Sequence, residues 1–111
     1  MRVKARESDV QKAIMELLAA ERVLAIRLNT AAFRVGKRVI HTHSGGAGVA
    51  DILAFPQRRN CEMPEIWWIE CKSPDGRQTP EQVNFEGLVT GHGHRYIVAR
   101  SADDVLKELR G

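Results

Sequence analysis

The feature that most constrains how this chain folds is a pair of charged residues at the end of an apolar strand. Residues 66–69 are Ile, Trp, Trp and Ile, and the tripeptide Glu70-Cys71-Lys72 continues the same run. Because successive side chains of a strand point to opposite faces, Glu70 and Lys72 share one face and Cys71 packs on the other. A protein interior accepts a carboxylate and an ammonium only where their charges are compensated. The strand is therefore expected to end at a polar site.

A third charged residue lies in another apolar strand. Asp51 precedes Glu70 by 19 residues and belongs to the segment 49–55, which follows a glycine-rich loop. Hard divalent cations prefer carboxylate oxygens, so Asp51 and Glu70 are candidate metal ligands, and the backbone carbonyl of Cys71 is a candidate third. Lys72 would hold or deprotonate an attacking water, or stabilise charge that grows on a phosphate. An Asp followed by Glu-x-Lys on adjacent strands is typical of nucleases that cleave phosphodiester bonds.

Each of these residues also has a purely structural interpretation. Asp51 could be an exposed residue at the end of a strand, and Glu70 and Lys72 could form a salt bridge at a strand edge. Buried ion pairs contribute little net stability, which makes them poor candidates for scaffolding alone. The functional interpretation is therefore preferred for all three residues.

Glu7 is a fourth candidate, on the first predicted helix. It lies three residues before Val10 and seven before Ile14, which places it on the core-facing stripe of the helix 7–20. In the functional interpretation Glu7 reaches the metal directly or through water. The alternative is a first-turn acid that complements the helix dipole.

Gln82 is the fifth candidate, near the start of a later helix. Thr79 at the N-cap and Gln82 at N3 match a capping box, which explains Gln82 without any functional role. Gln82 also shares a helical stripe with Phe85 and Val89, so it could point at the site and orient the lysine or a phosphate.

Hydrophobic periodicity and turn residues predict seven main elements. Helices are expected over 7–20, 79–90 and 101–110, and strands over 23–29, 49–55, 65–72 and 95–100. Segments 33–35 and 38–42 flank Gly36-Lys37 and are expected to pair as a hairpin. The order α-β-β-β-α-β-α, with one possible extra strand, predicts an α/β fold with a mixed sheet and helices on both faces.

The composition fits one soluble domain over residues 1–111. With 43% hydrophobic residues the chain can build a real core. No apolar run approaches the ~20 residues of a membrane span, so no membrane partner is expected. The two cysteines do not suggest a disulfide framework and favour a reduced, cytoplasmic setting.

The charge distribution offers candidate DNA contacts. The net charge of +3 permits a polyanionic partner without requiring one. Arg34, Lys37 and Arg38 cluster in one segment, and Ser44 and Arg77 lie in neighbouring loops. These five residues are candidates for contacts with DNA, with solvated surface charge as the alternative interpretation.

Two His-x-His pairs, His41 with His43 and His92 with His94, could bind a transition metal. No acid accompanies either pair at a fixed spacing. Scattered surface histidines, or histidines that contact phosphate, are therefore the preferred interpretation.

Taken together, these motifs resemble the virus-type replication-repair nuclease domain (VRR-NUC), a branch of the PD-(D/E)XK nuclease superfamily. The matching residues are Glu7, residues 48–53, residues 69–74, Gly76, Thr79 with Gln82, and residues 96–101. They span essentially the whole chain, as in a stand-alone minimal member of the kind carried by phages. Ala50 is a departure, because Pro often precedes the Asp in this family.

The resemblance implies a PD-(D/E)XK restriction-endonuclease-like core and a Mg²⁺- or Mn²⁺-dependent DNA endonuclease for branched DNA, above all four-way (Holliday) junctions in DNA repair. It also implies a homodimer, no small-molecule cofactor, and a phage or prophage origin in a bacterial host cell. Trp67, Trp68 and the segment 30–43 are candidate dimer contacts. The alternatives are a non-catalytic module of the same fold that binds branched DNA, and a restriction-type nuclease that reads sequence.

Overall fold

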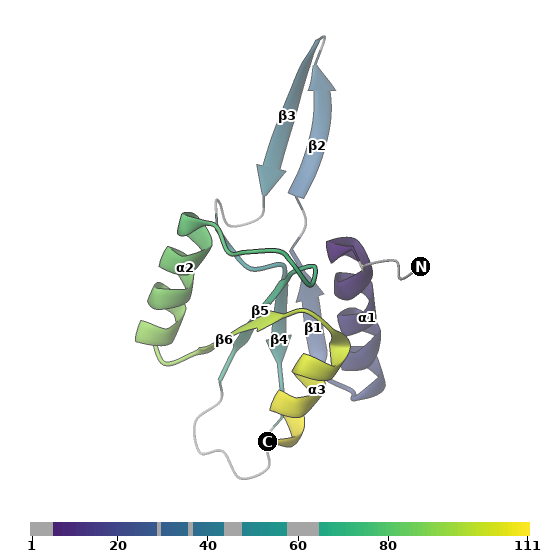
Figure 1. Cartoon of the computed structure of the whole chain (residues 1–111), viewed down its shortest axis with the longest axis vertical. Helices are drawn as coiled ribbons and strands as arrows, with labels where there is room; N and C mark the ends of the chain where they lie inside the picture. The colour runs from purple at the N-terminus through teal and green to yellow at the C-terminus, as the bar shows by residue number, and fades with distance from the viewer. Residues whose placement is uncertain (1–5, 29, 36, 44–47, 58–64) are drawn as a thin grey trace.

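In the described part of the chain, three helices surround a four-stranded mixed sheet, and a separate hairpin extends from this body (Figure 1). The structure is a computed structural model that describes residues 6–28, 30–35, 37–43, 48–57 and 65–111. The helices are α1 (Glu7–Ala20), α2 (Pro80–Gly91) and α3 (Ala102–Arg110). The strands are β1 (Leu24–Arg27), β2 (Thr30–Val35), β3 (Arg38–His43), β4 (Ile52–Phe55), β5 (Trp67–Cys71) and β6 (Arg95–Ala99). None of the described helices is long and apolar enough to cross a membrane.

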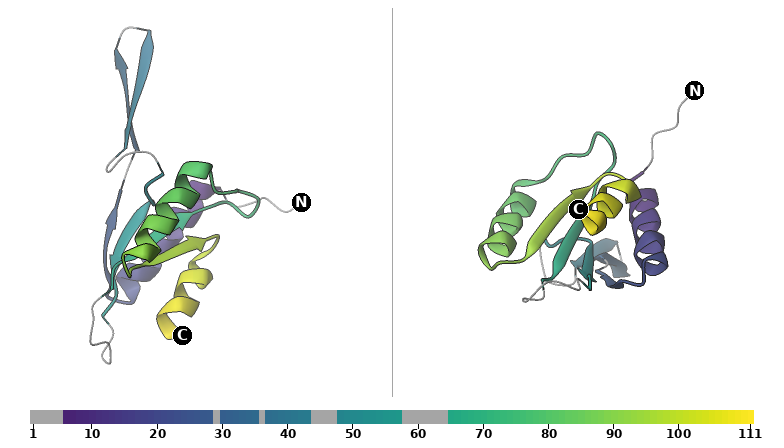
Figure 2. Two further views of the ribbon diagram at one scale, coloured as in Figure 1. Left: turned by 90° about the vertical axis from the view of Figure 1, so that its left-hand side faces the viewer. Right: turned by 90° about the horizontal axis from the view of Figure 1, so that it is seen from below.

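The central sheet has the strand order β1-β4-β5-β6. β4 pairs antiparallel with both β1 and β5, whereas β5 and β6 are parallel. A parallel pair needs a crossover connection, which α2 supplies. α2 lies on one face of the sheet, while α1 and α3 lie on the other (Figure 2). The predicted α/β architecture with a mixed sheet and helices on both faces is confirmed.

The face of the sheet that α1 and α3 cover is apolar. Ile52 of β4, Ile69 of β5 and Ile97 of β6 are neighbours in the strand register and belong to one buried cluster. The other buried members of this cluster are Val10, Ile14, Leu18, Ala54, Trp67, Cys71, Ala99 and Val105. The helical stripe expected for residues 7–20 therefore does face the core, through its residues 10, 14 and 18.

The face that α2 covers is built around aromatic rings. Trp68 of β5 lies beside Tyr96 of β6 in the parallel register. Phe85 of α2 meets both rings edge-on, with centroid distances of 5.1 Å to Trp68 and 6.1 Å to Tyr96. Edge-to-face geometry at these distances is favourable for aromatic pairs, so the three rings fix how α2 sits on the sheet.

Local hydrogen bonds determine where α2 and α3 begin. The Thr79 hydroxyl accepts the N–H of Gln82 at 3.2 Å, and Gln82 Oε1 accepts the N–H of Thr79 at 2.8 Å. At the start of α3, Ser101 Oγ accepts the N–H of Asp104 at 3.3 Å. These contacts satisfy backbone donors that a helix leaves open in its first turn. Both N-caps predicted from the sequence are confirmed.

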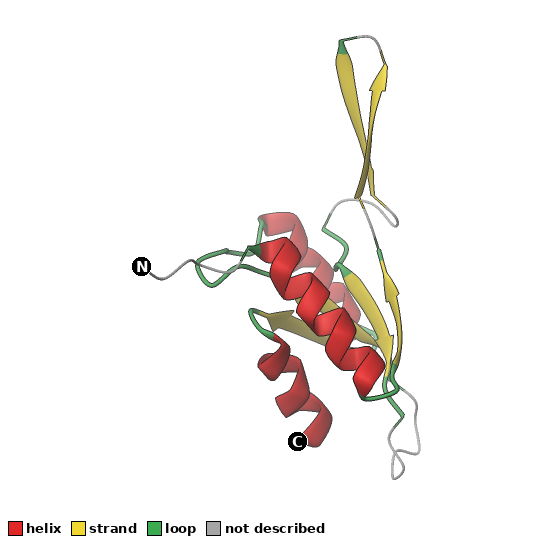
Figure 3. Ribbon diagram, turned by 90° about the vertical axis from the view of Figure 1, so that its right-hand side faces the viewer, coloured by secondary structure: helices red, strands yellow, loops and turns green. Residues whose placement is uncertain are grey.

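The hairpin predicted around Gly36-Lys37 forms a two-stranded sheet of its own. Thr30 pairs with His43, and Val35 pairs with Arg38, so β2 and β3 are paired along their whole length. The hairpin projects from one end of the body (Figures 1 and 3). The predicted α-β-β-β-α-β-α order holds within the body. The predicted order allowed for one extra strand, whereas the hairpin contributes two. These two strands pair with each other and satisfy each other's backbone hydrogen bonds.

Candidate active site

The sheet places Asp51 beside the end of β5. Ile52 pairs with Ile69, and one further step along this antiparallel register sets Asp51 opposite Glu70. The Asp51 carboxylate accepts the backbone N–H of Cys71 through Oδ2 at 2.8 Å. Residues directly opposite each other in such a pair share a face of the sheet. Asp51 and Glu70 are therefore brought together as predicted.

Asp51 lies one residue before β4 rather than inside the predicted strand 49–55. The chain is bent there because Gly48 has a φ of +82° and passes close to the first turn of α2. A Cβ atom on Gly48 would lie 2.5 Å from the backbone oxygen of Glu81, a distance that real Cβ atoms do not tolerate. Glycine at this position lets the loop that carries Asp51 pack under α2.

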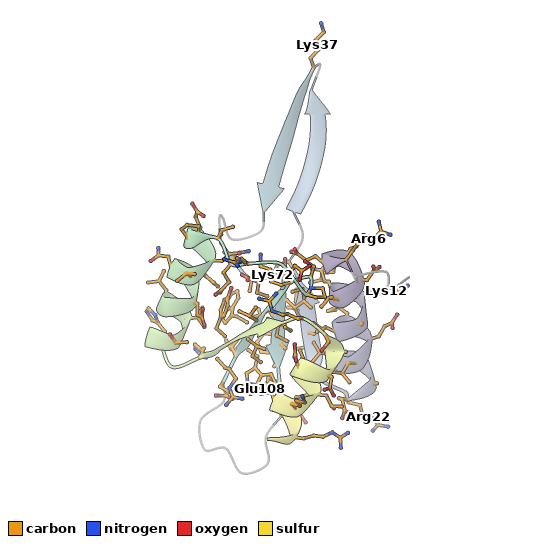
Figure 4. The ribbon with its side chains drawn as sticks, viewed as in Figure 1. Arg6, Lys12, Arg22, Lys37, Lys72 and Glu108 are labelled. Atoms are coloured by element: carbon orange, nitrogen blue, oxygen red, sulfur yellow. The ribbon has the colours of Figure 1, made fainter. Side chains whose placement is uncertain are left out.

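Glu70 is fully buried, with 0% of its surface exposed. Its Oε1 accepts a hydrogen bond of 2.5 Å from the hydroxyl of Tyr96. Its Oε2 lies 3.9 Å from Nζ of Lys72, which is itself only 6% exposed. Beyond this ion pair, Glu70 Oε2 is a buried oxygen without a hydrogen-bond partner. The prediction that Glu70 and Lys72 share a face is confirmed, and Figure 4 shows Lys72 at the end of the body from which the hairpin extends.

Burial raises the pKa of Glu70 above its ordinary value. The hydrogen bond from Tyr96 and the charge of Lys72 act in the opposite direction, whereas the charges of Asp51 and Glu7 raise the pKa further. All four of these residues are therefore close enough to influence the Glu70 carboxylate. An unpaired carboxylate oxygen in a buried position is costly, and a cation bound there would compensate it.

Cys71 has its side chain on the apolar face, whereas its backbone carbonyl is the candidate metal ligand. Its thiol is buried in the α1/α3 core and is a free cysteine, as the strand alternation predicts. Burial raises the pKa of this thiol, and the charges of Asp51, Glu7 and Glu70 raise it further. The thiol is therefore protonated at neutral pH and serves packing. The Cys71 carbonyl as a third metal ligand stays a prediction.

Glu7 and Gln82 each lie in the first turn of a helix. Glu7 is the first residue of α1 and is exposed, so it does not join the buried part of the stripe as its spacing suggested. Its charge nevertheless acts on Glu70 and Cys71. Gln82 uses Oε1 in the capping box with Thr79. The structure thus shows the capping role of Gln82, and its contact with the lysine or a phosphate stays a prediction.

The loop that follows Lys72 is held against the site by Arg100. Arg100 Nη1 donates to the carbonyls of Ser73 at 2.8 Å and Gly76 at 2.6 Å. A Cβ atom on Gly76 would lie 3.3 Å from Cδ of Lys72, so this loop packs directly on the lysine side chain. Arg100 and Gly76 therefore help to confine Lys72, although the sequence indicated them only as residues that match the family motifs.

The described side chains limit how a metal ion could be bound at this site. Among the described residues, no three His, Cys, Asp or Glu side chains lie close enough together to hold a metal by themselves. Mg²⁺ usually keeps several waters and binds through one or two carboxylates together with substrate phosphates. Asp51 and Glu70 provide such a carboxylate pair, and Glu70 Oε2 has no hydrogen-bond partner. The residues present therefore fit a Mg²⁺ or Mn²⁺ site whose remaining ligands would be waters and a phosphate.

The ring nitrogens of His92 and His94 contact backbone atoms. His94 Nδ1 accepts the backbone N–H of Ile66 at 3.1 Å, and His92 Nδ1 lies 2.7 Å from the carbonyl of Leu88. These contacts are structural. His41 and His43 belong to β3, where the structure describes the backbone pairing alone.

The candidate DNA contacts are spread over two regions. Lys37 is exposed at the tip of the hairpin (Figure 4), and Arg77 is exposed in the loop after β5. Arg34 and Arg38 lie in the hairpin strands, where their backbone pairing alone is described. Ser44 lies outside the described residues.

The two tryptophans lie on opposite faces of the sheet, and Trp68 as a dimer contact stays a prediction. Trp67 is fully buried in the α1/α3 core and donates from Nε1 to Glu65 at 2.8 Å. Trp68 is partly buried against Phe85 on the opposite face. Trp67 is therefore wrong as a candidate dimer contact, because strand alternation turns it into the interior.

Comparisons with models of protein families, with curated proteins and with solved structures found no match for this chain. The functional interpretation therefore depends on the arrangement of Asp51, Glu70 and Lys72 and on the motif resemblance described above.

Proposed function

We propose that this protein is a metal-dependent endonuclease that hydrolyses phosphodiester bonds in branched DNA, with a PD-(D/E)XK core of the VRR-NUC type. One observation supports this proposal above all others. The buried Glu70 carboxylate has an oxygen without a hydrogen-bond partner, and this oxygen lies 3.9 Å from the ammonium of Lys72. A purely structural ion pair would be expected to satisfy both carboxylate oxygens.

In this proposal Asp51 and Glu70 hold Mg²⁺ or Mn²⁺, the Cys71 carbonyl provides a third ligand, and Glu7 completes the shell through water or holds a second ion. When bound, the divalent cation supplies Lewis-acid stabilisation of the negative charge that develops during in-line attack on the phosphate. The protein residues hold the ligands in fixed positions. The hydrogen bond from the Cys71 N–H fixes Asp51, and burial limits the motion of Glu70.

Lys72 is the proposed catalytic residue that acts on the attacking water. Its ammonium is almost completely buried and is held 3.9 Å from Glu70 Oε2, so it lies beside the position of the metal. From there it can donate to the attacking water or to a phosphate oxygen. Electrostatic stabilisation is stronger in a site that excludes water than on the surface.

The hairpin supports binding to DNA. It extends from the end of the body at which Lys72 lies, and it carries exposed Lys37 at its tip (Figure 4). A two-stranded ribbon is narrow enough to enter the major groove of duplex DNA. A two-fold homodimer would present two such sites and two hairpins to a four-way junction, which has matching symmetry. Backbone-dominated binding predicts a steep loss of affinity with salt.

The test is cleavage of end-labelled DNA with Mg²⁺ or Mn²⁺, comparing a four-way junction, a flap, linear duplex and single strand. We expect paired, symmetric cuts in the junction. Lys72→Ala should slow cleavage by roughly 10²- to 10⁴-fold while junction binding persists. Asp51→Ala should abolish both cleavage and metal binding. Lys107→Ala is the matched control, because Lys107 is an exposed lysine paired with Asp103 in α3.

The outcomes separate the alternatives. Near-wild-type cleavage by Asp51→Ala would reject the assignment of the site. Junction binding without cleavage by the wild-type protein would indicate a non-catalytic DNA-binding module. Cleavage of linear duplex that depends strongly on sequence would indicate a restriction-type nuclease instead.

A further inference from the structure

Tyr96 contacts the proposed metal ligand from the neighbouring strand. Its hydroxyl donates to Glu70 Oε1 at 2.5 Å, across the parallel pair of β5 and β6. The residue is 9% exposed, and its ring meets Phe85 of α2 edge-on. The backbone of β6 and this ring contact together fix where the hydroxyl lies. Tyr96 is therefore placed by β6 and α2, and it belongs to the same buried cluster as Ala50, the residue before Asp51.

A second polar residue lies near the Tyr96 hydroxyl. The side chain of Gln78 comes beside this hydroxyl. Gln78 Nε2 donates to Glu86 Oε1 of α2 at 3.1 Å, which anchors the amide. The Tyr96 hydroxyl donates its own proton to Glu70 Oε1. Burial and the neighbouring Glu70 raise the pKa of Tyr96, so the hydroxyl keeps its proton at neutral pH.

The hydrogen bond from Tyr96 makes the two oxygens of Glu70 different. Oε1 is occupied by Tyr96, whereas Oε2 has no hydrogen-bond partner and lies on the side of Lys72. A carboxylate held at one oxygen cannot turn freely about its terminal bond, so the oxygen without a hydrogen bond is the one most open to a cation. Hydrogen bonds of this kind orient metal ligands and tune the affinity of metal sites.

We propose that Tyr96 is a positioning residue that fixes Glu70 so that Oε2 is the oxygen presented to the metal, with the neighbouring Gln78 helping to keep the Tyr96 hydroxyl in place. This inference rests on the proposed function, because it takes Glu70 to be a metal ligand. It extends that function by assigning the selection of the ligating oxygen to β6 and to the segment before α2. A tyrosine that only filled space could be replaced by phenylalanine without any effect on metal affinity.

The experiment is a calorimetric titration of Mn²⁺ into the full chain without DNA, with metal-dependent cleavage of a four-way junction measured beside it. Tyr96→Phe keeps the ring and removes only the hydroxyl. We expect its Mn²⁺ affinity to fall by about 10- to 100-fold. Gln78→Ala should lower the affinity in the same direction by a smaller factor. Because Gln78 belongs to a loop, this variant also serves if Tyr96→Phe does not fold.

Val105→Ala is the control for packing alone, since it truncates a fully buried side chain of α3 on the opposite face and leaves Tyr96 and its contacts in place. It should lower the melting temperature and leave Mn²⁺ affinity unchanged. If Tyr96→Phe and Gln78→Ala both bind Mn²⁺ as the wild type does, the inference is wrong and the proposed nuclease stands. If the wild-type chain binds no Mn²⁺ and cuts no DNA, the proposed function fails and takes the inference with it.

Discussion

The two faces of the central sheet are built from the same strands but carry different side chains. On the face covered by α1 and α3, β5 contributes Trp67, Ile69 and Cys71, all completely buried in an apolar cluster. On the face covered by α2, the same strand contributes Trp68 and Glu70, and Lys72 follows. Residues adjacent in sequence thus serve packing on one face and polar chemistry on the other.

The comparison shows how a small domain can hold a buried charge. A buried carboxylate with one oxygen that lacks a hydrogen bond destabilises the folded chain, so the stabilisation must come from elsewhere. The α1/α3 face supplies it by burying large apolar side chains against two helices. Substitutions on the first face should therefore reduce stability, and substitutions on the second should reduce activity.

The largest effect on stability is expected for Trp67→Ala on the apolar face. Trp67 is fully buried, and the Arg95 guanidinium lies over its ring at 5.2 Å. Removing a buried tryptophan side chain typically costs about 3–5 kcal/mol. Urea unfolding would measure the loss. Trp68→Ala is the matched substitution on the opposite face, where the residue is only partly buried, and a loss as large as that of Trp67→Ala would contradict the comparison.

A smaller effect is expected for Gly48→Ala at the edge of the α2 face. The added Cβ would approach the backbone of Glu81 to 2.5 Å, and the φ of +82° is unfavourable for alanine. We expect a loss of about 1–3 kcal/mol and weaker Mn²⁺ binding, because the loop that carries Asp51 must shift. Gly87→Ala is the control, since a Cβ there meets no other atom within 4 Å. Equal behaviour of the two variants would argue against this packing role.

The smallest effect is a dependence of stability on pH that arises from Glu70 in the metal-free chain. Its pKa is raised in the folded state, above the ordinary value of 4.5 expected for the unfolded chain. The folded chain therefore binds the proton more tightly than the unfolded chain does. The free energy of unfolding should fall as the pH rises from about 4.5 through the folded pKa.

Urea unfolding with a chelator present, measured across this pH range, tests the prediction. The Glu70→Gln variant should lack this part of the decline, because its amide does not titrate. A difference in unfolding free energy between the two proteins that stays constant with pH would show that Glu70 is not the source. Excess Mg²⁺ should reduce the decline in the wild type, since the metal binds the deprotonated carboxylate.

Much of the fold could be predicted from the sequence because its signals are local. The stripe of Val10 and Ile14 identified α1, and the caps at Thr79 and Ser101 identified the starts of α2 and α3. The shared face of Glu70 and Lys72 follows from the alternation of side chains along one strand. These features depend on residues close in sequence, and short-range rules describe them well.

The contacts that were missed depend on residues far apart in the chain. Tyr96 reaches Glu70 over 26 positions, and only the parallel pairing of β5 with β6 brings them together. The bend at Gly48, which ends the strand early, depends on the position of α2. Trp67 and Trp68 look alike in the sequence, and only the packing of helices on both faces decides which one is fully buried.

A backbone hydrogen bond closes the segment that carries the hairpin where this segment meets the body. β1 ends at Arg27, whose partner in β4 is Ile52, and the N–H of Leu28 donates to the carbonyl of Asp51 at 2.7 Å. This hydrogen bond joins the point where the chain leaves β1 to the point where it enters β4. Since the free energy of closing a loop grows slowly with its length, the arm can be shortened, lengthened or exchanged in evolution while Asp51 keeps its place. A different arm could thus be joined to an unchanged arrangement of Asp51, Glu70 and Lys72.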